Sequence, residues 1–174
     1  MIELKTGNVV ASVPGGGNGT PAILGDYAAA CDVKGLCAYK LSATSIERLW
    51  TVPFNDDFSS PIIDGKYVYA VGGSDYYMKE NKPGKAVCLE LETGKVMWEE
   101  ALPLANHGSP VLADGKLIAV VGKELVMFKA GPEKFQLVGR ADLGLERWVT
   151  PAIVDGKVFL RTAKKVVCYD LAKH

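Results

Sequence analysis

The sequence has no long apolar run and no excess of one charge. No segment approaches the roughly 18 consecutive apolar residues that a membrane-spanning helix needs. Its 20 basic and 20 acidic residues give a formal net charge of zero, whereas nucleic-acid-binding proteins normally carry a basic excess. These absences argue against an integral membrane protein and against a general nucleic-acid binder.

Residues that could bind a metal are also scarce. There are four cysteines and two histidines, and no two cysteines form a CxxC pair, so a structural zinc site is not expected. Because free cysteines are usually buried, we expect all four to pack inside strands. They are Cys31, Cys37, Cys88 and Cys168.

What the sequence does contain is an internal repeat. Three segments align, SSPIIDGKYVYAVGG from Ser59, GSPVLADGKLIAVVG from Gly108 and VTPAIVDGKVFLRTA from Val149. A weaker copy, GTPAILGDYAAACDV, starts at Gly19. The prolines of the four copies are 40, 49 and 41 residues apart, and a polar insertion at residues 74–85 accounts for the longer interval.

Each copy has the same order of signals. A small residue or hydroxyl residue and a proline lead into a short apolar run, a two-residue turn and a second run. Turns are predicted at Asp64–Gly65, Asp114–Gly115 and Asp155–Gly156, because Asp-Gly favours a type I′ hairpin. In the weaker copy Gly25–Asp26 takes that place. A third strand follows, and in the first three copies a fourth. Four antiparallel strands in about 40–45 residues are typical of a β-propeller blade.

The stretch KAVCLELETGKVMWEE resembles the quinoprotein-type (PQQ-like) propeller repeat, through Cys88–Glu90, Thr93–Lys95 and Trp98. Glu90 stands where that repeat usually has Asp. Tryptophan is expected to dock between neighbouring blades, and the first copy has Trp50 in the corresponding place, whereas the third copy lacks it. The resemblance implies either a quinone-dependent dehydrogenase or a non-catalytic scaffold similar to the outer-membrane assembly lipoprotein BamB.

The repeat predicts full blades at residues 19–53, 59–103 and 108–144, a partial blade at 149–174, and the end of a blade at 1–14. Residues 8–13 would then supply the outer strand to the sheet of residues 150–172. This closure could occur within one chain, as a four-bladed ring, or between two chains, as an eight-bladed homodimer, which we favour. The chain could also be part of a larger propeller.

Candidate binding residues lie three positions before each proline, where the loop into the innermost strand should approach the channel mouth. They are Asn18, Phe58, His107 and Trp148, with Asp57 and Arg147 as neighbours. Ordinary loop packing is the alternative for all of them. The pair Asp56–Asp57 could bind a metal or serve in acid–base chemistry, or it could simply be solvated.

We therefore expect a non-catalytic scaffold for a protein or peptide partner, with an enzyme that uses the channel mouth as the alternative. The quinone enzymes that the resemblance implies use adjacent cysteines and a calcium ion, and no two cysteines here are adjacent. No PQQ or calcium cofactor is expected, and no nucleic-acid partner. The first residues, MIELKTGNVV, have no signal-peptide pattern, although relatives of this repeat are periplasmic or exported.

Overall fold

The structure, a computed structural model, describes residues 1–32, 34–54, 56, 58–73, 83–104, 108–145 and 149–171. These residues form fifteen β-strands and no helix, which confirms the predicted all-β class. In chain order the strands are β1 (Ala22–Leu24), β2 (Tyr27–Asp32), β3 (Gly35–Leu41), β4 (Ile46–Val52), β5 (Ile62–Asp64), β6 (Tyr67–Gly72), β7 (Gly84–Glu90), β8 (Val96–Leu102), β9 (Val111–Ala113), β10 (Lys116–Val121), β11 (Glu124–Lys129), β12 (Leu137–Asp142), β13 (Ala152–Val154), β14 (Lys157–Arg161) and β15 (Val166–Asp170).

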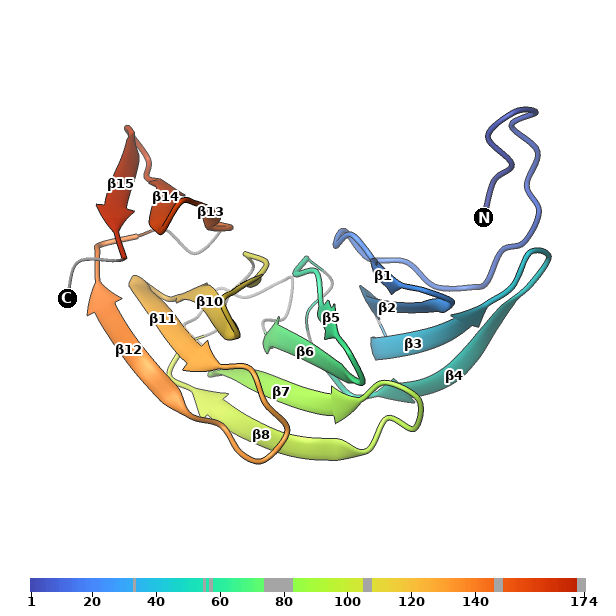
Figure 1. The fold of residues 1–174 in the computed structure, drawn as a ribbon, viewed down its shortest axis with the longest axis horizontal. Coiled ribbons are helices and arrows are strands. Elements are labelled where there is room, and N and C mark those ends of the chain that lie inside the picture. The colour runs from blue at the N-terminus through green and yellow to red at the C-terminus, as the bar shows by residue number, and fades with distance from the viewer. Residues whose placement is uncertain are drawn as a thin grey trace.

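The strands form four antiparallel sheets in which consecutive strands are neighbours. Sheets β1–β4, β5–β8 and β9–β12 have four strands, and β13–β15 has three among the described residues. Figure 1 shows the sheets arranged around an open arc, with β1, β5 and β13 toward its concave side and β4, β8 and β12 on its convex side. They are propeller blades, and we number them blades 1 to 4 in chain order.

The turns between the first two strands of each blade depend on positive backbone φ angles. Both residues of Asp114–Gly115 and of Asp155–Gly156 have φ between 49° and 70°, as type I′ turns require. In blade 2 the prediction was wrong by one residue, because β5 runs through Asp64 and the turn is Gly65–Lys66. Gly65 has φ of 57°, and glycine in the first turn position is typical of a type II′ turn.

The hydrophobic core lies between the blades. Because successive residues of a strand point to opposite faces, β6 serves two interfaces at once. Val68 and Ala70 pack toward blade 1, whereas Tyr69 and Val71 pack toward blade 3. Each inner blade is therefore held by neighbours on both faces.

Trp98 joins blade 2 to blade 3. Its ring is 7% exposed and lies 6.1 Å from the ring of Phe128 and 5.6 Å from that of Phe135, both nearly edge-on. Its Nε1–H donates to the carbonyl of Gly131 at 2.7 Å. The predicted docking of tryptophan between blades is confirmed.

Trp50 joins blade 1 to blade 2 in the same way. Its Nε1–H donates to the carbonyl of Leu91 at 2.8 Å, and its ring lies over Gly94 of the Thr-Gly turn. A Cβ on Gly94 would lie 2.7 Å from the indole ring. The turn thus needs glycine both for its φ of 72° and for the contact with the preceding blade's tryptophan.

Residues 2–9 form a hairpin with the geometry of the Thr-Gly turn in blade 2. Ile2 pairs with Val9, and the N–H of Gly7 donates to the carbonyl of Glu3 at 2.8 Å, as Gly94 does to Glu90 at 2.9 Å. Each turn also has a threonine hydroxyl that donates to the glutamate carboxylate three residues before it. Ile2–Val9 is an isolated bridge and not a pair of strands, so the expectation that residues 1–14 are the end of a blade stays a prediction.

This hairpin does not complete blade 4 within the same chain. Among the described residues β15 pairs with β14 alone, and Figure 1 shows the N-terminus and blade 4 at opposite ends of the arc. The four-bladed ring closed by residues 8–13 of one chain is therefore not the arrangement found. The physical reason is distance, because four blades at this curvature span only an open arc.

Three of the four cysteines are buried, as predicted, but Cys168 is exposed. Cys168 pairs with Phe159 on the outward face of blade 4. Its counterpart in blade 2 is Cys88, which is fully buried in the cluster that contains Trp98. The prediction fails for Cys168 because no described blade covers that face.

Candidate functional site

Four mouth loops lead into the innermost strands, at residues 14–21, 53–61, 103–110 and 143–151. A chain of hydrogen bonds, the hydroxyl ladder, ties them together from blade to blade. The N–H of Thr20 donates to Ser60 Oγ at 2.8 Å, that of Ser60 to Ser109 Oγ at 2.9 Å, and that of Ser109 to Thr150 Oγ1 at 3.0 Å. Each of these residues precedes the proline of its repeat, so the ladder holds equivalent points of all four loops.

The backbones of adjacent mouth loops also touch directly. A Cβ on Gly19 would lie 2.6 Å from the carbonyl oxygen of Ser59, and one on Gly108 would lie 2.1 Å from that of Val149. A larger residue at either position would push the two loops apart. Glycine therefore allows the mouth loops to pack as one surface.

Asp56 and Ser59 organise the mouth loop of blade 2 from within. Asp56 is 3% exposed, and its Oδ1 accepts the N–H groups of Phe58 at 2.8 Å and Ser59 at 3.0 Å. Its carboxylate lies against Gly72, where a Cβ would be 2.2 Å from Oδ2. The Ser59 hydroxyl donates to the carbonyl of Val71 at 2.9 Å. Asp56 is therefore not solvated, and its contacts give it a structural role in the loop. Its predicted pairing with Asp57 in metal or acid–base chemistry stays a prediction, because Asp57 lies outside the described residues.

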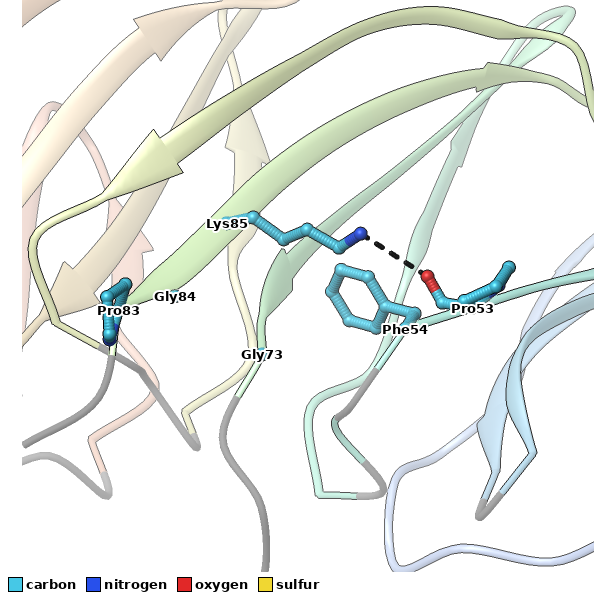
Figure 2. Close-up of a pocket in the computed structure, with 6 residues that line it drawn as sticks. All are labelled: Pro53, Phe54, Gly73, Pro83, Gly84 and Lys85. Atoms are coloured by element: carbon cyan, nitrogen blue, oxygen red, sulfur yellow. Dashed lines mark hydrogen bonds between the residues drawn. The ribbon is translucent and has the colours of Figure 1, made fainter. Parts of the chain in front are cut away.

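A pocket of about 230 Å³ opens beside this loop, lined by Pro53, Phe54, Gly73, Pro83, Gly84 and Lys85. Figure 2 shows Lys85 reaching over the Phe54 ring toward the Pro53 carbonyl. Its ammonium donates to that carbonyl at 3.3 Å and lies 5.8 Å from the ring centroid. Lys85 also pairs with Glu99 at 2.9 Å. The pocket therefore places the apolar ring of Phe54 beside the Lys85 ammonium, whose position is fixed by these two contacts.

Buried thiols and a carboxylate lie behind the mouth of blade 1. Asp32 is 3% exposed, accepts the N–H of Lys34 at 2.6 Å and lies 3.8 Å from the Arg48 guanidinium. Burial raises the pKa of the Cys31 thiol well above its usual range, and the nearby Asp56 carboxylate raises it further. In blade 2, burial likewise raises the pKa of the Cys88 thiol to about 11. Both thiols are protonated at neutral pH and are poor nucleophiles.

Of the predicted binding residues, Asn18 and Phe58 lie among the described residues, on adjacent mouth loops. Gly19, next to Asn18, packs near the Phe58 carbonyl, with 3.3 Å from its Cβ position to that oxygen. Phe58 is half-buried and Asn18 is exposed. Asp57, His107, Arg147 and Trp148 lie outside the described residues.

The sequence reasoning missed the hydroxyl ladder and the roles of Asp32 and Asp56. A hydroxyl residue directly before each repeat proline was a visible signal for the ladder. Asp56 precedes Ser59 by three residues, and an Asp side chain that accepts N–H groups two and three residues ahead is a common turn device. The hydroxyl signal does not show by itself which residue of the neighbouring blade will be the partner.

The described residues contain no group of three or more His, Cys, Asp or Glu side chains that could hold a metal ion. In the same part of the chain, no helix is long and apolar enough to cross a bilayer.

Comparisons with known proteins agree with this architecture. Solved structures with the same fold include BamB from Moraxella catarrhalis, with a TM-score of 0.66 and 16% identity over 90% of this chain and 46% of that chain. The computationally designed Ika8 protein matches with a TM-score of 0.72 and 12% identity, over 97% of this chain and 51% of that one. The designed Ika4 protein matches with a TM-score of 0.69 and 11% identity, over 96% of this chain and 100% of that one.

The chain thus spans about half the length of the BamB structure that it matches. A search of curated proteins found no match. The family model described as outer membrane protein assembly factor BamB matches residues 70–173, which is more than half of the chain. On that evidence the chain belongs to the PQQ-like propeller family of the assembly factor BamB.

Proposed function

We propose that this chain is a non-catalytic scaffold that binds a protein or peptide partner at its mouth loops. The observation that carries the proposal is the hydroxyl ladder, which holds the four loops in a fixed relation through Thr20, Ser60, Ser109 and Thr150. Loops positioned by a rigid framework are the usual place for binding residues. The family model, described as an outer membrane protein assembly factor, supports a scaffold role at the level of the family.

The pocket in Figure 2 supplies the chemistry for such a partner. The ring of Phe54 can pack against an apolar side chain, and the Lys85 ammonium can meet an acidic group beside it. The proposed contact surface also includes Asn18 and Phe58 and, from their sequence positions, Asp57, His107, Arg147 and Trp148. The raised pKa values of the buried thiols favour binding over thiol catalysis.

The test is selection of peptides from a random display library against the immobilised chain. We expect the selected peptides to lose binding to Phe58→Ala, because that change removes an aromatic surface from the mouth loops. They should keep binding to Lys95→Ala, which alters an exposed residue in the Thr-Gly turn of blade 2. Circular dichroism checks that both variants are folded.

Peptides that bind Phe58→Ala as tightly as the unaltered chain, or a selection that yields no peptide, would contradict the proposed mouth-loop site.

We also propose that two copies of the chain close an eight-bladed ring with two-fold symmetry. Both ends of the hydroxyl ladder support this arrangement. Among the described residues the N–H of Thr150 and the hydroxyl of Thr20 have no hydrogen-bond partner, and Thr150 of one copy could donate to Thr20 of the other. That bond would continue the blade-to-blade pattern without a break.

The N-terminal hairpin and blade 4 supply a second argument for the dimer. Leu4 in the hairpin is 98% exposed, whereas its counterpart Leu91 in blade 2 is 3% exposed. On blade 4, Val166 is 68% exposed at the outer strand. Pairing the hairpin of one copy with β15 of the other would cover both apolar surfaces and remove an open sheet edge.

We expect sedimentation velocity to show a dimer whose population rises with protein concentration. Alkylation followed by mass spectrometry gives the matching chemical readout. Cys168 should be modified in dilute protein and protected in the dimer, while Cys31, Cys37 and Cys88 stay protected throughout because they are buried. A monomer at all concentrations, with Cys168 equally reactive in every sample, would rule the closed dimer out.

A further inference from the structure

A cavity of about 300 Å³ lies between blades 3 and 4. Its apolar walls are Ile118 and Met127 from blade 3 and Ile153 and Leu171 from blade 4, and Asp114 and Lys116 contribute to its lining from the turn side. An apolar cavity of about 150 Å³ can take up benzene in a protein. This one is therefore large enough for a two-ring aromatic group.

The inner part of the cavity, at Ile118, Met127 and Ile153, lies where the other two interfaces between blades hold an indole ring. Its outer part, near the turns, has a counterpart beside Trp50 in a pocket lined by Gly25, Tyr27 and Lys66. Trp50 pairs with Ala38, and Trp98 pairs with Cys88, each next to a one-residue register shift in the outer strand. The outer strand of blade 3 has the same register shift, and the residue in the tryptophan's position beside it is Gly139, which pairs with Met127. Cross-strand partners share one face of a sheet, and Met127 lines the cavity.

Gly139 leaves this position open. A Cβ on Gly139 would meet no atom within 4 Å, whereas the indole rings of Trp50 and Trp98 fill the equivalent places. The third interface therefore has the walls of a tryptophan site without the tryptophan.

The hydrogen-bond acceptor that Trp50 uses is also present, whereas Trp98 donates to Gly131, one residue beyond the equivalent place in blade 3. Trp50 Nε1–H donates to the carbonyl of Leu91, whose own N–H bonds to the Lys66 carbonyl at 2.8 Å. Leu171 holds the same place in blade 4, because its N–H bonds to the Gly156 carbonyl at 2.7 Å. Among the described residues no donor reaches the carbonyl of Leu171.

We propose that this cavity binds the indole ring of a tryptophan side chain from a partner polypeptide, with the indole N–H donating to the Leu171 carbonyl. The inference rests on the proposed scaffold function and names a second contact for the partner, away from the mouth loops. Tryptophan is a frequent anchor of protein interfaces. A purely aliphatic side chain would leave the carbonyl without a donor.

The experiment is an NMR titration of the chain, labelled at its isoleucine and methionine methyl groups, with N-acetyltryptophanamide. We expect chemical-shift changes at Ile118, Met127 and Ile153, and intermolecular NOEs between the indole ring and the Met127 methyl. Gly139→Trp should abolish both, because the new side chain occupies the cavity. N-acetyl-leucinamide at the same concentration should give no shift.

Arg140→Trp is the matched control, since it adds the same ring one residue along β12. Arg140 pairs with Val126, which faces blade 2, so this variant should bind the probe as the unaltered chain does. The wild-type NOEs decide the matter if Gly139→Trp does not fold.

Absence of the NOEs, equal shifts with the leucine probe, or undiminished binding by a folded Gly139→Trp would overturn the inference. Mouth-loop binding is measured separately through Phe58→Ala. Peptides that still depend on Phe58 while the indole probe fails would therefore reject the indole site and leave the scaffold function standing.

Discussion

Replacing Trp98 with alanine is expected to lower the free energy of unfolding by about 3–5 kcal/mol, the usual effect of truncating a buried aromatic ring. Trp98 is 7% exposed and contacts the rings of Tyr69, Phe128 and Phe135. Its loss also removes the only donor that reaches the Gly131 carbonyl among the described residues. A domain of this kind is stable by about 5–15 kcal/mol, so the variant should be near the limit of folding.

The loss should also change how the chain unfolds. Blades contact only their neighbours, and in repeat architectures stability is a sum of unit and interface contributions. Because Trp98 lies at the central interface, its removal should divide the arc into two weakly coupled pairs of blades. Urea denaturation followed by circular dichroism should then give a broader transition at lower urea.

Trp98→Phe is the control that separates ring packing from the hydrogen bond. It keeps much of the apolar contact and loses only the indole N–H and one ring, so we expect a smaller loss, about 1–2 kcal/mol. Trp50→Ala provides a comparison at the blade 1–blade 2 interface, where the ring is half-buried. A Trp98→Ala variant as stable as Trp50→Ala, with an equally sharp transition, would contradict the central role of Trp98.

Much of this fold could be predicted because its signals are local and repeated. The prolines, the Asp-Gly turns and the Thr-Gly-Lys turn before Trp98 each specify a short stretch of backbone, and four copies at similar spacing specify a blade. The hairpin at residues 2–9 follows from the same logic, since Thr6–Gly7 repeats the local hydrogen bonds of Thr93–Gly94.

What could not be predicted depends on contacts between distant segments. Asp56 looked like one of two solvated loop carboxylates, and its burial follows from the close approach of Gly72, on another strand. Cys168 has the same local sequence setting as Cys88, yet it is exposed because a neighbouring blade covers only Cys88. The one-residue shift of the Gly65–Lys66 turn, by contrast, follows from spacing that the sequence shows. Asp64 is three residues after its repeat proline, whereas Asp114 and Asp155 are four residues after theirs, and in every blade the turn begins four residues after the proline.

Gly35→Ala should be the most damaging glycine substitution near the mouth, because it combines backbone strain with a steric clash. Gly35 has φ of 136°, and a Cβ there would lie 2.1 Å from the carbonyl oxygen of Val52. We expect a loss of about 2–6 kcal/mol, from about 1–3 kcal/mol of backbone strain and about 1–3 kcal/mol of overpacking. Relief of the clash would move Val52 and with it Phe54, which lines the pocket of Figure 2.

Two further glycines separate these contributions within the same chain. Gly25 has φ of 56° with no atom within 4 Å of a Cβ, so Gly25→Ala tests strain alone and should lower stability by about 1–2 kcal/mol. Gly139→Ala meets neither strain nor contact, and since glycine weakens a strand it should leave stability unchanged or raise it slightly. When the three variants are measured side by side, the urea midpoint should be highest for Gly139→Ala, lower for Gly25→Ala and lowest for Gly35→Ala. A Gly35→Ala midpoint equal to that of Gly25→Ala would mean that the end of the strand at Val52 shifts at no cost in stability. The mouth beside Phe54 would then not be the rigid surface that partner binding requires.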